Sequence, residues 1–123
     1  MKAITTILSV CYLLSMSLGI QAKHHEDALE LEQLAQAFGW DLEGAEIETQ
    51  KVAEGLYVLF GVGGNIAVSI GKDGVLIVDD QLPQVIDKIE AAIAKVGGEG
   101  VDYAVNTHWH FDHAEGNFTL ESV

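Results

Sequence analysis

The spacing of apolar residues changes several times along the chain, and each change predicts a different element. Residues 3–18 are mainly apolar, with no charged residue among them. Across residues 26–38 the apolar positions recur every three or four residues, which predicts an amphipathic helix ending at Gly39. Short runs rich in β-branched and aromatic residues then predict strands. These runs are residues 46–52, 56–60, 66–70 and 75–78.

The helical spacing returns in residues 84–96, after Pro83, a residue suited to the first turn of a helix. Residues 101–105 predict a further strand. Residues 75–78 are almost continuously apolar, which predicts a strand covered on both faces. The order is therefore strand, helix, strand, and open α/β sheets usually place their sites after such strands. The fold class predicted is α/β.

The first 22 residues predict a cleavable signal peptide. Lys2 precedes the apolar run, and Ile20-Gln21-Ala22 offers a small residue before a cleavage point. The alternative, a membrane anchor, is disfavoured because the apolar core is shorter than the ~20 residues of a spanning helix. We therefore expect an exported protein, periplasmic or secreted, with no membrane association after cleavage. The expected organisation is residues 1–22 as signal peptide, 23–45 as helix and connection, and 46–123 as the domain.

Composition removes several classes of function. The chain carries 6 basic and 19 acidic residues, for a formal net charge of −13. Nucleic-acid binding needs a basic face, so it is not expected. The one cysteine, Cys11, falls inside the predicted signal peptide, so no disulfide is expected in the remaining stretch. His24 and His25 predict a solvated tail.

The chemistry gathers near the C-terminal end, in the run His-x-His-x-Asp-His. Imidazole nitrogen and carboxylate oxygen are the ligands that zinc takes in hydrolytic sites. In extended backbone His108, His110 and Asp112 share one side, whereas His113 points the other way. The chain must bend near residues 111–113 for all four side chains to converge. That pattern suits two adjacent metals better than one, and Trp109 and Phe111 are expected to pack behind the ligands.

The stretch NTHWHFDHAEGN, residues 106–117, resembles the metal-binding motif of the metallo-β-lactamase-fold hydrolases. The resemblance implies that His108 and His110 belong to one zinc, and that Asp112 and His113 belong to a second. It also implies that Asp112 orients the nucleophile. The His at position 113 makes the motif more similar to the third subclass of metallo-β-lactamases, glyoxalase II and lactonases than to the other two subclasses.

Two further stretches are interpreted through the same resemblance. Asp79, at the end of the predicted strand 75–78, corresponds to an acid that supports the metal loop, although the neighbouring Asp80 could take that role. The glycine-rich run Gly63, Gly64, Asn65 superficially suggests a nucleotide-binding turn. A strand follows it and not a helix, so a hairpin loop is the better interpretation. In the family such a loop borders the substrate pocket.

The resemblance implies the first half of an αββα metallo-β-lactamase-type sandwich. The family's remaining ligands come from the second half, and no His follows His113 here. We therefore expect a fragment that needs a missing C-terminal half, or another chain, to complete its site. The implied function of the parent protein is zinc-dependent hydrolysis of a small-molecule substrate, with hydroxide on one of two zinc ions attacking a carbonyl or ester-like centre. The alternatives are an iron-containing oxidoreductase of the same fold and a non-catalytic metal-binding half-domain.

Overall fold

The computed structural model describes residues 29–120. The chain divides into two units, residues 1–30 and 31–123, and nearly all of the described part belongs to the second. The predicted signal peptide and His24 and His25 lie outside the described residues. Within residues 29–120, no helix is both long enough and apolar enough to cross a membrane.

A five-stranded sheet in the order β1-β2-β3-β4-β5 forms the centre of the second unit. Its first four strands form an antiparallel meander, and β5 joins β4 in parallel. The strands are β1 (Glu48–Ala53), β2 (Leu56–Phe60), β3 (Ile66–Gly71), β4 (Gly74–Val78) and β5 (Tyr103–Val105). The sequence predicted all five.

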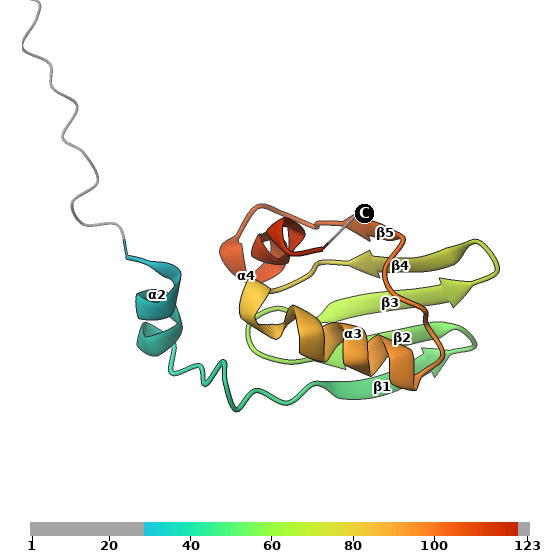
Figure 1. Cartoon of the computed structure of the whole chain (residues 1–123), viewed down its shortest axis with the longest axis horizontal. Helices are drawn as coiled ribbons and strands as arrows, with labels where there is room; N and C mark the ends of the chain where they lie inside the picture. Colours follow the sequence, from blue (N-terminus) through green and yellow to red (C-terminus); the bar gives the residue numbers. More distant parts are fainter. Residues whose placement is uncertain (1–28, 121–123) are drawn as a thin grey trace, which may run out of the picture. The chain divides into compact units, whose positions relative to one another are not determined.

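The crossover from β4 to β5 contains the 3-10 turn η2 (Pro83–Val85) and helix α3 (Ile86–Lys95). Figure 1 shows α3 lying along one face of the sheet. Alternate strand residues Leu59, Val68 and Ile77 are fully buried in one cluster with Ile89 and Ile93 of α3. The core therefore lies between this helix and one face of the sheet, as the two periodicities predict.

Strand β4 corrects one prediction. It was expected to be covered on both faces, yet only Val75 and Ile77 are buried, while Leu76 and Val78 are half-buried. Side chains alternate between faces, so the second pair faces away from α3. No helix or second sheet among residues 29–120 covers that face of β4. The continuous apolar run 75–78 therefore places two apolar side chains on a partly exposed face.

The ends of two elements also differ from prediction. Helix α2 (Leu31–Ala37) begins later than residue 26, and of the residues before it only Leu29 and Glu30 are described. Strand β5 begins at Tyr103 and not at residue 101. Asp102 explains the second difference, because its carboxylate accepts a hydrogen bond from the Val75 amide at 2.7 Å in place of a backbone partner.

Candidate metal centre

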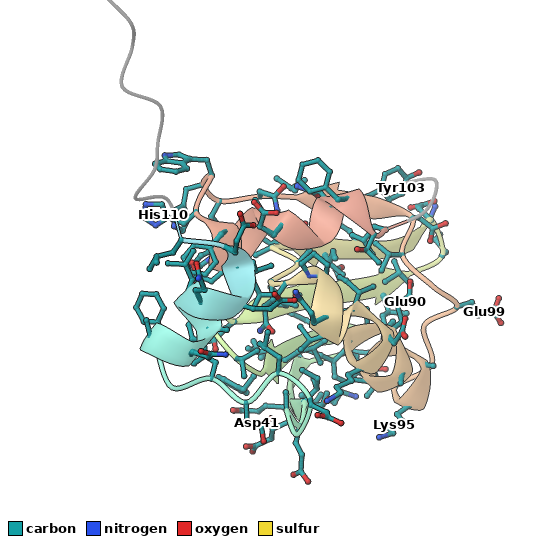
Figure 2. All side chains as sticks on the ribbon, turned by 60° about the vertical axis from the view of Figure 1, so that its left-hand side comes forward. Asp41, Glu90, Lys95, Glu99, Tyr103 and His110 are labelled. Atoms are coloured by element: carbon teal, nitrogen blue, oxygen red, sulfur yellow. The ribbon has the colours of Figure 1, made fainter. Side chains whose placement is uncertain are left out.

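The residues of the metal motif meet at the end of the sheet where β4 and β5 finish. After β5 the chain bends at Thr107 and His108, is extended at His110 (φ −61°, ψ 145°) and then turns into the short helix α4 (Phe111–Ala114). The turn η3 (Glu115–Phe118) follows. The predicted bend near residues 111–113 is therefore confirmed at Phe111. Figure 2 shows His110 at the opposite end of the sheet from Lys95 and Glu99.

The motif side chains form two pairs. His108 Nε2 and His110 Nδ1 are 3.1 Å apart, and His113 Nε2 lies 3.4 Å from Asp112 Oδ2. Two ligands of one tetrahedral zinc, each about 2.0–2.1 Å from the ion, are separated by roughly 3.4 Å. Both pairs thus have the separation and the donor atoms that a shared ion requires.

The two pairs are neighbours, since the rings of His108 and His113 have centroids 4.1 Å apart. Within residues 29–120, however, no three His, Cys, Asp or Glu side chains are grouped as a metal cluster. A catalytic zinc usually has three protein ligands. Taken alone, each pair supplies two such ligands.

Asp79 fixes which ring nitrogen of His113 is available. Its Oδ2 lies 2.8 Å from His113 Nδ1, so Nδ1–H donates to the carboxylate and Nε2 keeps its lone pair. The same carboxylate accepts hydrogen bonds from the Thr107 amide at 2.7 Å and from the Thr107 hydroxyl. Since that hydroxyl proton is committed to Asp79, Thr107 Oγ1 accepts from His108 Nδ1 at 2.9 Å. One carboxylate thus orients a histidine in each pair.

Asp79 is suited to this task because it is almost fully buried yet charged. Burial alone would raise its pKa, but hydrogen bonds from His113 and Thr107 outweigh burial and lower the pKa below its usual range. Its backbone has φ +66°, a conformation uncommon outside glycine. Its amide donates to the Val105 carbonyl at 2.9 Å, which ties the ends of β4 and β5 together.

Asp80, the alternative acid, has a different role. Its Oδ2 accepts a hydrogen bond from Asn106 at 3.0 Å, and its amide donates to the His113 carbonyl at 3.0 Å. Asn106 also donates to that carbonyl, at 2.8 Å. Asp80 therefore holds the backbone of α4, and it is Asp79 that contacts the imidazole. Burial raises the pKa of Asp80.

The glycine-rich loop between β2 and β3 lies against the second pair. The Gly64 amide donates to the Asp112 carbonyl at 3.4 Å. A Cβ atom at Gly64 would lie 2.5–2.9 Å from three atoms of the His113 ring, and one at Gly63 would lie 2.8 Å from Asp112 Cβ. Only residues without side chains fit here. The loop borders the candidate centre; a pocket role for Gly63, Gly64 and Asn65 remains a prediction.

Two aromatic residues that follow α2 pack against Phe111 of α4, and the sequence analysis did not predict this cluster. Phe38 stacks on Trp40 with ring centroids 5.0 Å apart, and Phe111 lies 5.9 Å from Trp40. Phe111 therefore packs behind the ligands as predicted. Trp109 does not: it is 84% exposed, and its ring meets the His110 ring edge-on at the surface, with centroids 4.8 Å apart. Aromatic residues just after α2 were the one signal for this cluster.

Residues 59–123 match the family model of the metallo-beta-lactamase superfamily, so the chain belongs to that superfamily. Comparison with curated proteins gave no match. Among solved structures, the chain is similar to a subclass B3 metallo-beta-lactamase of Bradyrhizobium japonicum (26% identity, TM-score 0.55, 63% of this chain and 30% of the other). A subclass B3 enzyme from a soil metagenome library is similar too (26%, 0.57, 66% and 31%).

The native FEZ-1 metallo-beta-lactamase of Legionella gormanii shares the fold at 22% identity, with a TM-score of 0.56 and coverage of 62% and 30%. The chain thus spans about 30% of the length of the enzymes it matches. The predicted family and the predicted fold class, the first part of a metallo-β-lactamase-type sandwich, are confirmed.

Proposed function

We propose that this chain supplies the first half of a two-zinc centre in an exported hydrolase. The observation that carries the proposal is the pair of ligand-like separations, 3.1 Å between His108 and His110 and 3.4 Å between His113 and Asp112. His108 Nε2 and His110 Nδ1 hold the first ion. Asp112 Oδ2 and His113 Nε2 hold the second, and Asp79 keeps the His113 ring in the required tautomer.

When bound, zinc in such a site lowers the pKa of a coordinated water and polarises the bond to be cleaved. The chain's own contribution is orientation. Asp112 lies in the first turn of α4, where its carboxylate also orients the attacking nucleophile. Asp80, Asn106 and the loop at Gly64 hold the backbone of α4, so the Asp112 carboxylate is kept in one position relative to the nucleophile.

The substrate class we propose is a small molecule with a strained or activated carbonyl, of which β-lactams are the first to test. The solved relatives are named metallo-beta-lactamases. Lactones and thioesters present the same electrophilic carbon and are natural comparators. The fold does not choose among these substrates, and the remaining ligands and pocket walls would come from sequence or a chain beyond the described residues.

The test uses a protein in which this chain is joined to, or mixed with, the rest of the domain. Zinc content and hydrolysis of a β-lactam, a lactone and a thioester are measured for the wild type and His110→Ala. We expect the variant to lose one zinc and most of the activity. An open catalytic zinc site has only three protein ligands, so the loss of one weakens metal binding strongly. Equal zinc content in both proteins would refute the proposal.

A further inference from the structure

Gln81 is a fully buried polar residue that the proposed chemistry does not use. It follows Asp79 and Asp80 directly and has φ +58°, a conformation that disfavours any residue with a side chain. Its Oε1 is buried without a hydrogen-bond partner among the described residues. Both features are destabilising. A strained backbone and a half-satisfied buried amide next to a metal motif point to a role in the site.

The NH2 group of the same Gln81 side chain indicates what that role is. Gln81 Nε2 donates a hydrogen bond to the carbonyl oxygen of Gly64, in the loop between β2 and β3. Gly64 then makes two contacts of its own: its amide donates to the Asp112 carbonyl, and its backbone lies against the His113 ring. A continuous set of contacts therefore runs from Gln81 through Gly64 to Asp112 and His113.

These contacts reach one ligand pair and not the other. The side chains of Asp112 and His113 are 23% and 21% exposed, and both lie against the glycine loop. His108 and His110 are exposed and have no such contact with the loop: His108 is hydrogen-bonded to Thr107, the two rings contact each other, and the His108 ring also lies 4.1 Å from the His113 ring, centroid to centroid. A change in the position of the loop would therefore act directly on the second pair and reach the first pair only through the contact between the His108 and His113 rings.

We propose that Gln81 is a positioning residue for the second ligand pair: its amide holds Gly64 against Asp112 and His113 and so raises the metal affinity of that pair. The inference rests on the proposed zinc function. It also accounts for the conformation at position 81, because φ +58° is what turns the side chain back from the end of β4 toward the glycine loop.

The test is zinc titration of the 123-residue chain with ¹⁵N-labelled histidine rings. The ring signal of His113 follows the second pair, and those of His108 and His110 follow the first. Gln81→Met keeps the length of the side chain and removes the donor. Removing an outer partner of a metal ligand typically weakens metal binding about 10–100-fold. We expect that loss at His113 and a smaller change at His108 and His110, which the loop does not contact. Gln84→Met, on the exposed side of η2, is the control and should alter neither.

A second measurement needs no variant. Zinc binding at the second pair should slow hydrogen exchange of the Gln81 side-chain amide and of the Gly64 backbone amide in the wild type, because coupling between two sites is reciprocal. His113 responding at equal zinc concentration in the wild type and Gln81→Met would overturn the inference, as would exchange that zinc leaves unchanged. Absence of any ring response to millimolar zinc would instead refute the proposed function.

Discussion

At the scale of single residues, Asp79 connects the two ligand pairs. It contacts His113 directly and His108 through Thr107, so one buried carboxylate sets the tautomers of two candidate ligands. Its oxygens are fully used by these partners. A residue with this pattern of contacts acts on metal affinity without binding metal itself.

Replacing Asp79 by Asn tests this role. The amide retains the shape but lacks the negative charge, and it can present an N–H to the nitrogen that should donate. We expect zinc affinity to fall about 10–100-fold, measured by titration calorimetry. Asp73→Asn is the matched control, since Asp73 is an exposed acid in the turn between β3 and β4. Similar zinc affinities for the two variants would contradict the assignment.

Asp80 gives a prediction for pH dependence. Burial raises its pKa in the folded state above the ordinary value of 3.8, so folding favours the protonated form. The stability that this proton contributes is present below the unfolded pKa and is lost as the pH rises through the folded pKa. Compared with Asp80→Asn, the wild type should therefore lose free energy of unfolding as pH rises from about 4, until Asp80 is fully ionised. Urea unfolding of both metal-free proteins across that range measures the difference, and a constant difference would contradict it.

The sequence predicted that the four motif residues converge and that Asp79 supports them, but it did not predict the other supporting contacts. His108, His110, Asp112 and His113 are adjacent in sequence, so their spacing alone predicts that they converge. Gln81 and Asn106 act through partners 17 and 7 residues away, and although Asn106 begins the motif stretch, the sequence does not show which groups either side chain contacts. The positive φ at Asp79 and Gln81 is equally hidden, because glycine is the residue that signals such a backbone.

At the scale of elements, the hydrophobic period predicted every strand and α3 to within a few residues. The period is set by burial against one face, and α3 and the sheet bury each other. The errors arise where another interaction ends an element. At β5 a side-chain carboxylate replaces a backbone partner, and the spacing of apolar residues contains no information about that exchange.

Lys88 on α3 holds the connection between α2 and β1. Its Nζ donates to the carbonyls of Leu42, Glu43 and Ala45, at 3.2, 2.5 and 2.9 Å. Lys88→Met keeps the aliphatic stem and removes all three bonds, so we expect a loss of about 1–3 kcal/mol of unfolding free energy, measured in urea. Lys95→Met, an exposed lysine in the last turn of α3, should change stability by less than about 0.5 kcal/mol. Equal effects would argue against the bond to this segment.

At the scale of the whole molecule, we expect residues up to about Ala22 to be removed during export. The expectation rests on the charged start, the apolar run and the small residue before a polar stretch. Mass spectrometry of secreted or periplasmic material gives the N-terminus directly. An intact Met1 in that material would show that the leader is not cleaved.

The sheet face opposite α3 forms a second large-scale feature. Strand register places Leu56, Leu76 and Tyr103 in one row across the sheet, with Ser69 between the first two. Val58, Ala67, Val78 and Val105 form the next row. Tyr103 and Val105 are 56% and 53% exposed. Contiguous apolar surface of this kind is typical of a surface that associates with another layer or another chain.

We expect residues 23–123 alone to self-associate through that face and to lack multiple-turnover hydrolysis. Association buries the apolar rows, and β5, the last strand of the sheet among residues 29–120, offers its outer backbone edge as a further pairing site. Catalysis fails because each ion has two side chains from this chain where a catalytic zinc has three. Tyr103→Lys with Val105→Lys should shift sedimentation velocity toward monomer. Gln84→Lys, which adds positive charge on an exposed site away from this face, should leave association unchanged. A wild-type monomer that holds two zinc ions tightly and turns over a lactam repeatedly would show that this chain completes the site unaided.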